Sequence, residues 1–166
     1  LSIEEIAATM WISYLMAAAG SIVGGWFSGY LMKTKSVDAA RKITITVGGL
    51  LVFIGFVSII QFVGENNFMT FIYLAGLVLF GFQFAIGNVQ TISSDLFRGP
   101  SVGTLAGLAG TVAAVSPMIM NWFIGTITSG GSYTPAFIAI TVSVILGVLS
   151  IFVLIKTIGP VRKVAE

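Results

Sequence analysis

The stretch ITITVGGLLVFIGFVSIIQFV, residues 43–63, runs its whole length without a charged residue. A helix needs about 20 consecutive apolar residues to cross the roughly 30 Å hydrocarbon core of a bilayer, and this stretch meets that length. Similar apolar stretches lie on both sides of it, so the sequence predicts an all-α, polytopic transmembrane helix bundle. Five membrane spans are expected, at about residues 6–32, 43–63, 68–92, 102–127 and 135–158.

The composition excludes most other classes of protein. Of the 166 residues, 57% are hydrophobic and 8% are charged, against about 25% charged in an ordinary soluble domain. The chain contains no cysteine and no histidine, which removes disulfides, thiolate chemistry, the usual zinc sites and Ser-His-Asp triads. We therefore expect no metal, no cofactor and no enzymatic activity. The net charge of +2 is not gathered on one amphipathic helix, which argues against a nucleic-acid partner.

The charged residues predict an orientation, because cytoplasmic loops collect Lys and Arg. Counting alternate loops puts every cation on one side of the membrane: Lys33, Lys35, Arg41, Lys42, Arg98, Lys156, Arg162 and Lys163. The opposite side holds Glu4, Glu5 and Glu65 and no cation. The sequence thus predicts an N-out/C-in topology in the cytoplasmic (inner) membrane. Because an N-out first span without a basic n-region is not a signal peptide, we expect further spans to precede it.

Glycines recur at helical spacing in two of the predicted spans. Small residues four apart let membrane helices approach closely, so we expect the spans at 6–32 and 102–127 to pack tightly against neighbours. The residues assigned to packing or gating are Gly20, Gly24, Gly25, Gly29, Gly103, Gly107 and Pro117. Generic glycine enrichment of membrane helices is the plainer alternative. Pro117 predicts a kink in its span, with or without a functional role.

Polar side chains at membrane depth usually face a bundle interior or a water-filled path. The candidate cavity residues are Gln83, Asn88, Gln90, Thr111, Ser116 and Asn121. At 100° per residue Gln83 and Gln90 share a stripe, whereas Asn88 points elsewhere. For Asn121 a hydrogen bond to a neighbouring helix is an alternative to substrate contact. No charged residue lies near the middle of any predicted span, and Asp95 with Arg98 is interpreted as a capping or gating pair at a helix end.

Three short motifs resemble one family of transporters. The stretch GGWFSGYL at residues 24–31, followed by a basic loop and Ala40-Arg41-Lys42, resembles the signature loop of the major facilitator superfamily, in its copy between the eighth and ninth helices. The stretches SDLF at 94–97 and SVGTLAGL at 101–108 resemble the tenth-to-eleventh helix region of the anion:cation symporter family, especially its hexuronate-transporter-like members. The stretch GSYTPAF at 131–137 is similar to the same group.

The resemblance implies that the chain corresponds to helices eight to twelve of a twelve-helix transporter. It implies ion-coupled symport, with H⁺ or Na⁺, of an organic anion such as a hexuronate by alternating access. The expected partners are then the lipid bilayer, the missing N-terminal half and the small organic anion. Gly29 stands where the signature loop commonly has an acidic residue, which would leave Arg41 and Lys42 to act on a helix end or on lipid headgroups.

A second hypothesis belongs to a different class of protein. The glycine faces could instead assemble a non-transporting membrane scaffold or a channel-like subunit. That hypothesis predicts a stable oligomer of five-helix chains and no missing half.

Overall fold

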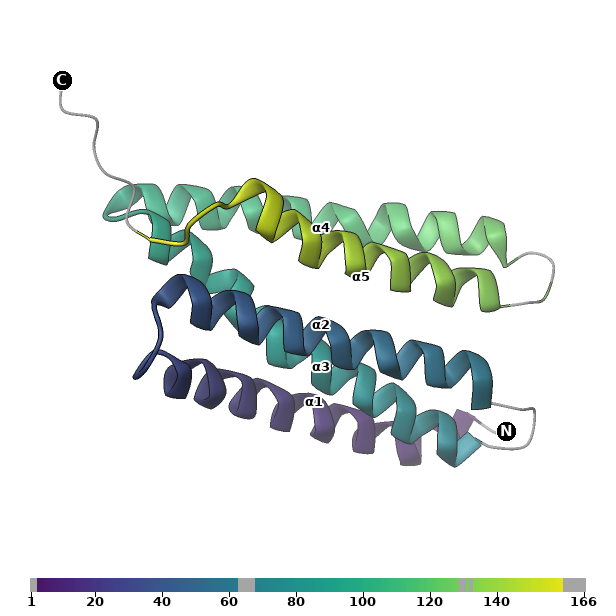
Figure 1. Ribbon diagram of the computed structural model, residues 1–166. Coiled ribbons are helices and arrows are strands. Elements are labelled where there is room, and N and C mark those ends of the chain that lie inside the picture. The colour runs from purple at the N-terminus through teal and green to yellow at the C-terminus, as the bar shows by residue number, and fades with distance from the viewer. Residues whose placement is uncertain (1–2, 63–67, 129–130, 132, 160–166) are drawn as a thin grey trace, which may run out of the picture.

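The computed structural model describes residues 3–62, 68–128, 131 and 133–159 (Figure 1). Five α-helices follow one another along the chain: α1 (Ile3–Leu31), α2 (Val37–Phe62), α3 (Phe68–Leu96), α4 (Pro100–Ile127) and α5 (Thr134–Leu154). Each contains a segment long and apolar enough to cross a membrane, and the described residues form no strand. The prediction of an all-helical bundle with five spans is confirmed.

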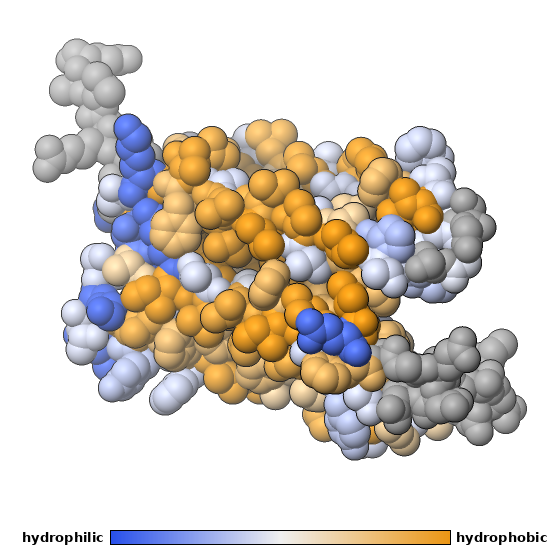
Figure 2. All heavy atoms as spheres, turned by 45° about the vertical axis from the view of Figure 1, so that its right-hand side comes forward, coloured by the Kyte–Doolittle hydropathy of each residue, from blue (hydrophilic) through white to orange (hydrophobic). Residues whose placement is uncertain are grey.

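The helices alternate in direction and gather the described cations at one end of the bundle. The turn between α1 and α2, the turn between α3 and α4 and the end of α5 lie together in Figure 1. We call this the cation end; it carries Lys33, Lys35, Arg41, Lys42, Arg98 and Lys156. Figure 2 shows the hydrophilic surface concentrated there, beside a broadly apolar flank. Arg162, Lys163 and Glu65 lie outside the described residues.

Helix α2 begins earlier than the apolar stretch that predicts it. Ser36 caps the helix, since the backbone N–H of Ala39 donates to Ser36 Oγ at 3.2 Å. Asp38 in the first turn adds a carboxylate that the helix dipole favours. Arg41 and Lys42, which the resemblance assigns to the signature loop, are therefore on the first turns of α2. Their positions on a helix fix the directions of both side chains.

Helix α5 ends earlier than predicted, at Leu154. The residues after it, 155–159, form an irregular tail that folds back against the cation end. Within this tail Ile158 is only 2% exposed and packs with Ile45 of α2 and Ile92 of α3. The tail thus joins the fifth helix to the second and third.

Helix α3 is the centre of the packing, with α1 on one side and α2 on the other. Gly20 and Gly24 of α1 bring that helix against the backbone of Phe80 and Phe84, where a Cβ atom would have no room. On the α2 side, a Cβ at Gly48 would lie 2.7 Å from the carbonyl oxygen of Gly81. Small residues in register therefore let three backbones meet closely.

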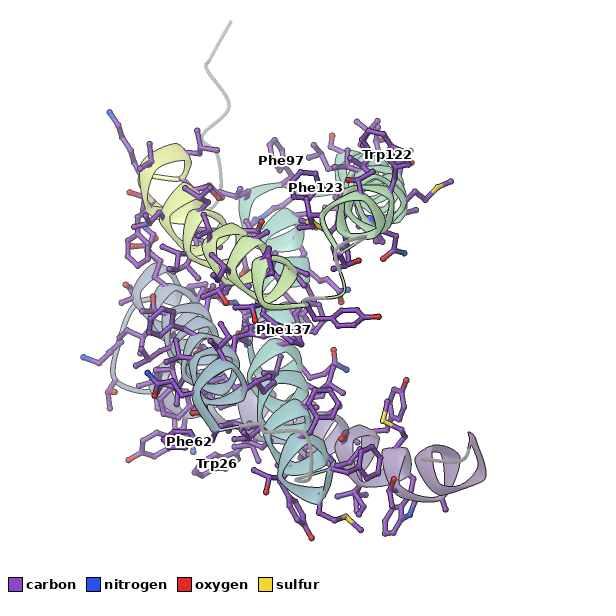
Figure 3. All side chains as sticks on the ribbon, turned by 90° about the vertical axis from the view of Figure 1, so that its right-hand side faces the viewer. Trp26, Phe62, Phe97, Trp122, Phe123 and Phe137 are labelled. Atoms are coloured by element: carbon purple, nitrogen blue, oxygen red, sulfur yellow. The ribbon has the colours of Figure 1, made fainter. Side chains whose placement is uncertain are left out.

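Helix α4 is packed quite differently from the other four. It contacts only α3 and α5, and none of its residues is buried. In Figure 3, which looks along the bundle, α4 with Trp122 and Phe123 lies apart from α1 and α2. Its chain enters from Gly99, whose positive φ of 71° makes the turn before Pro100.

The tight packing expected for four of the glycines is not found among the described residues. A Cβ built at Gly25, Gly29, Gly103 or Gly107 would meet nothing within 4 Å. The physical reason is directional: Gly25 and Gly29 lie on the face of α1 turned away from α3, and α4 has few neighbours of any kind. Spacing alone identified small residues but not the helices that face them.

Candidate functional site

The cation end contains a polar cluster that joins three helices. Arg41 of α2 donates from Nε to Asp95 Oδ2 of α3 at 2.8 Å. Its Nη1 donates to Asn88 Oδ1 of α3 at 2.8 Å and to Ser28 Oγ of α1 at 3.2 Å. We call these four residues the arginine cluster. One guanidinium thus holds the ends of α1, α2 and α3 together.

The burial of the arginine cluster makes it a specific contact. Ser28 and Asn88 are 1% and 2% exposed, and the side chains of Arg41 and Asp95 are 14% and 19% exposed. Buried polar groups are costly when they lack a hydrogen bond, and here each one has a partner. The fork of the guanidinium suits several acceptors at once, which a lysine ammonium would not match in geometry. The ion pair between Arg41 and Asp95 and the hydrogen bonds from Arg41 to Ser28 and Asn88 therefore stabilise the same contact between helices.

The arginine cluster bears on three of the predicted roles. Asp95 pairs with Arg41 of another helix, so the predicted pairing with Arg98 is wrong. Arg41 hydrogen-bonds to side chains near the ends of α1 and α3. Asn88 was predicted as a cavity residue, but its carboxamide oxygen accepts from Arg41 and it is buried, so the structure places it in the cluster.

A second polar contact fastens the tail to the start of α2. Asp38 Oδ1 accepts from Lys42 Nζ at 2.9 Å and from the backbone N–H of Ile158 at 2.8 Å. Lys42 Nζ also donates to the carbonyl oxygen of Lys156 at 2.9 Å. The tail is therefore held by hydrogen bonds to α2 as well as by the buried Ile158 side chain. The spacing of Asp38 and Lys42, four residues apart on one helix, is the sequence signal for this pair.

The remaining predicted cavity residues do not meet one another in the structure. Gln83 is half-buried, and Gln90, Thr111, Ser116 and Asn121 are exposed, as is Pro117, which was predicted for packing or gating. The hydroxyl of Thr111 donates to the carbonyl oxygen of Gly107 within its own helix. The glutamines are on α3 and the other three cavity candidates on α4, two helices with little mutual contact. The described residues do not form a closed polar cavity from this set.

Two hollows on the described surface are lined mainly by apolar residues. One lies between α2 and α5, with a volume of about 290 Å³. The other, of about 400 Å³, lies at the opposite end from the cations, among Ile59, Phe71, Tyr133 and Phe137. Figure 3 labels Phe137, whose ring also contacts that of Phe56. Neither hollow contains a residue predicted for the substrate cavity.

The arginine cluster was visible in the sequence only in part. Arg41 belonged to the resemblance, and Asp95 and Asn88 were each noted, but in separate roles. Opposite charges on two predicted helix ends were the available signal. Helix pairing was needed to join them, because Arg41 and Asp95 are 54 residues apart in the chain.

Five long apolar helices, with every described cation at one end, define a multi-pass membrane protein. The chain is similar to the hexuronate transporter of Escherichia coli strain K12, with 28% identity over 171 aligned residues. It has the same 28% identity to the hexuronate transporter of Escherichia coli O157:H7. These alignments cover 99% of this chain and 38% of each transporter.

The similarity indicates which class of membrane protein the chain resembles. It agrees with the resemblance seen in the short motifs, and with the five helices it is consistent with part of the C-terminal half of a major facilitator superfamily transporter of the hexuronate type. Both relatives are transporters, a class of protein that is not enzymatic, in agreement with the expectation from composition. The chain spans 38% of the length of these relatives. No protein-family profile matches the chain.

Proposed function

We propose that the chain is the last part of a secondary active transporter that moves an organic anion, such as a hexuronate or another sugar acid, across the cytoplasmic membrane. The observation that carries this proposal is the similarity to hexuronate transporters over 99% of the chain. The proposal includes symport with H⁺ or Na⁺, with H⁺ preferred, and alternating access around a site at the bilayer midplane. The missing N-terminal half would supply the coupling carboxylates.

The orientation follows from the cation end. Its six described cations favour the cytoplasmic face, which corresponds to an N-out/C-in topology. In this orientation the arginine cluster lies at the cytoplasmic ends of α1, α2 and α3. Because it joins three helices by one guanidinium, its role in the proposal is to keep them together while the two halves of the transporter rock.

The proposed substrate contacts come from α3 and α4 and do not include the arginine cluster. Gln83 and Gln90 on α3, with Thr111 and Ser116 on α4, are polar side chains able to hydrogen-bond the hydroxyls or the carboxylate of a sugar acid. Asn121 is retained as a weaker candidate. All of them except the half-buried Gln83 are exposed on the described helices, which leaves them accessible to a ligand or to further helices of the whole protein. Gly103 and Gly107 are proposed to face those further helices.

The direct test is uptake by cells that express the whole transporter. Labelled glucuronate and galacturonate are supplied with and without a protonophore. Accumulation that the protonophore abolishes would support H⁺-coupled symport of a sugar acid, and accumulation that depends on Na⁺ would support the other ion. Absence of uptake of both acids, with the protein in the membrane, would contradict the hexuronate assignment.

Gln83→Ala tests the proposed cavity stripe. We expect it to lower uptake by about five- to thirtyfold without loss of protein from the membrane, because a hydrogen bond to a substrate is worth roughly 1–2 kcal/mol. Gln61→Ala is the matched control, since Gln61 is an exposed glutamine of α2 outside the stripe. Uptake and membrane abundance are measured together. Normal uptake by Gln83→Ala would remove that residue from the site.

The scaffold hypothesis has no comparable support. The relatives found are transporters, and the glycines of α1 with partners face α3 of the same chain. Those glycines are therefore used within the bundle.

A further inference from the structure

A groove runs between α2 and α5 on the surface of the bundle. Its volume is about 290 Å³, and its walls include Thr46, Gly49, Leu50 and Phe53 from α2 with Val148 and Leu149 from α5. None of these residues belongs to the arginine cluster or to the proposed substrate contacts. The groove therefore needs a separate explanation.

The two helices pack together beneath the groove, through Ile45 with Val148 toward one end and Phe56 with Phe137 toward the other. A Cβ at Gly49 would lie 2.6 Å from Cγ2 of Val148, so this glycine permits the closest approach. Leu50 and Leu149, which line the groove, are 56% and 52% exposed. The result is an open groove between two membrane-spanning helices.

The walls of the groove offer nothing that would hold water or a polar ligand. Its one hydroxyl, on Thr46, donates to the carbonyl oxygen of Lys42 within α2 at 2.8 Å. Both helices are long and apolar enough to span the bilayer, so the surroundings of the groove are hydrocarbon. A hydrocarbon chain is the ligand that matches these walls.

One end of the groove reaches charged groups of the cation end. Lys42 lies one helical turn before Thr46, and its Nζ lies 5.7 Å from the ring centroid of Phe152. Two of its three N–H donors are used, by Asp38 and by the carbonyl oxygen of Lys156. Lys42 and Lys156 against Asp38 leave one positive charge in excess. Figure 2 shows the apolar flank meeting the hydrophilic end.

We infer that this groove binds one acyl chain of a phospholipid with an anionic headgroup, whose phosphate lies beside Lys42 and Lys156. Acyl chains elsewhere in the bilayer are as apolar as the groove, so hydrophobicity alone would not retain a particular lipid. Shape and headgroup charge supply the preference. A lysine near an anionic headgroup favours it by about fivefold, which sets the size of the expected effect.

The test uses photo-crosslinking in the whole protein, reconstituted in nanodiscs. The probes are phosphatidylglycerol and phosphatidylcholine with the same diazirine-bearing acyl chain, and mass spectrometry locates the cross-linked peptides. We expect cross-links on residues 46–53 and 144–149, about fivefold stronger for phosphatidylglycerol. Equal labelling by the two lipids, or no enrichment on these segments over the other apolar helix faces, would overturn the inference.

Two pairs of variants separate the groove from its charge. Leu149→Trp fills the groove and should abolish the cross-links, whereas Leu146→Trp, at an exposed leucine of α5 outside the groove, should leave them unchanged. Lys156→Gln should remove the preference for phosphatidylglycerol, and Lys33→Gln, which changes net charge equally at the turn after α1, should not. Equal cross-linking in the two leucine variants, or an equal preference for phosphatidylglycerol in the two lysine variants, would contradict the inferred lipid site.

Discussion

Helices α3 and α4 are close in length and similar in composition, yet they are packed in opposite ways. Both carry several glycines and polar residues within an apolar span. Helix α3 buries Ile72, Gly76, Gly81, Phe84, Asn88 and Ile92, whereas α4 buries none of its residues. The difference lies in the partners: α3 lies between α1 and α2, and α4 contacts only α3 and α5, each slightly.

This comparison shows that small residues acquire their role from the opposing surface. Gly24 and Gly25 are adjacent in the chain, but only Gly24 meets the backbone of α3. The same holds for polar groups. Asn88 is fixed by Arg41, while Thr111 of α4 bonds only to the preceding turn of its own helix.

The largest expected effect tests the close approach of α1 to α3. Gly24→Leu places a side chain against the backbone of Phe84 and should lower the free energy of unfolding by about 3 kcal/mol, at the upper end for overpacking. Gly25→Leu, one residue away with nothing within 4 Å, should change it by less than about 0.5 kcal/mol. Thermal unfolding of the chain in detergent micelles measures both. Equal destabilisation would refute the assigned packing.

The next effect tests the arginine cluster. Arg41→Gln should destabilise the chain by about 2 kcal/mol, because it leaves Asp95 and Asn88 partly buried without their donor. Adding Asp95→Asn should recover part of this loss, since both partners are then neutral. Arg98→Gln is the control, as Arg98 is an exposed cation of the same end. An unchanged melting temperature for Arg41→Gln would contradict the proposal that the arginine cluster holds α1, α2 and α3 together.

The smallest effect is expected on α4. Gly107→Leu should change the stability of the five-helix chain by less than about 0.5 kcal/mol, because a Cβ at this position meets nothing within 4 Å. In the whole transporter the same substitution should impair uptake if that face packs against further helices. Unfolding of the chain and uptake by cells are compared for the one variant. A large loss of stability in the chain alone would mean that α4 is packed more firmly than described.

Much of the fold was predictable because the bilayer imposes length and polarity on each span. The five spans and the single cation end followed from apolar runs and from the positions of Lys and Arg. The start of α2 was missed, since capping by Ser36 extends a helix beyond its apolar run. The end of α5 was missed because Ile158 continues the apolar run although it belongs to the folded-back tail.

The candidate site was less predictable than the spans. Periodicity on α3 separated Asn88 from Gln83 and Gln90 correctly in direction, but it could not reveal that Arg41 lies on the Asn88 side. Pairing between residues distant in sequence depends on which helices are neighbours. The positions of Thr111, Ser116 and Asn121 relative to a substrate remain predictions for the same reason.

The most direct measurement of the central claim is a pair of spin-label distance distributions. The chain contains no cysteine, so labels can be introduced at exposed positions alone. One pair, Ile22→Cys with Phe82→Cys, joins α1 to α3; the other, Phe82→Cys with Met118→Cys, joins α3 to α4. With the five-helix chain in nanodiscs, we predict a single narrow distribution for the first pair and a broad one for the second. Equally narrow distributions for both pairs would contradict the distinction between the packed group α1–α3 and the weakly held α4.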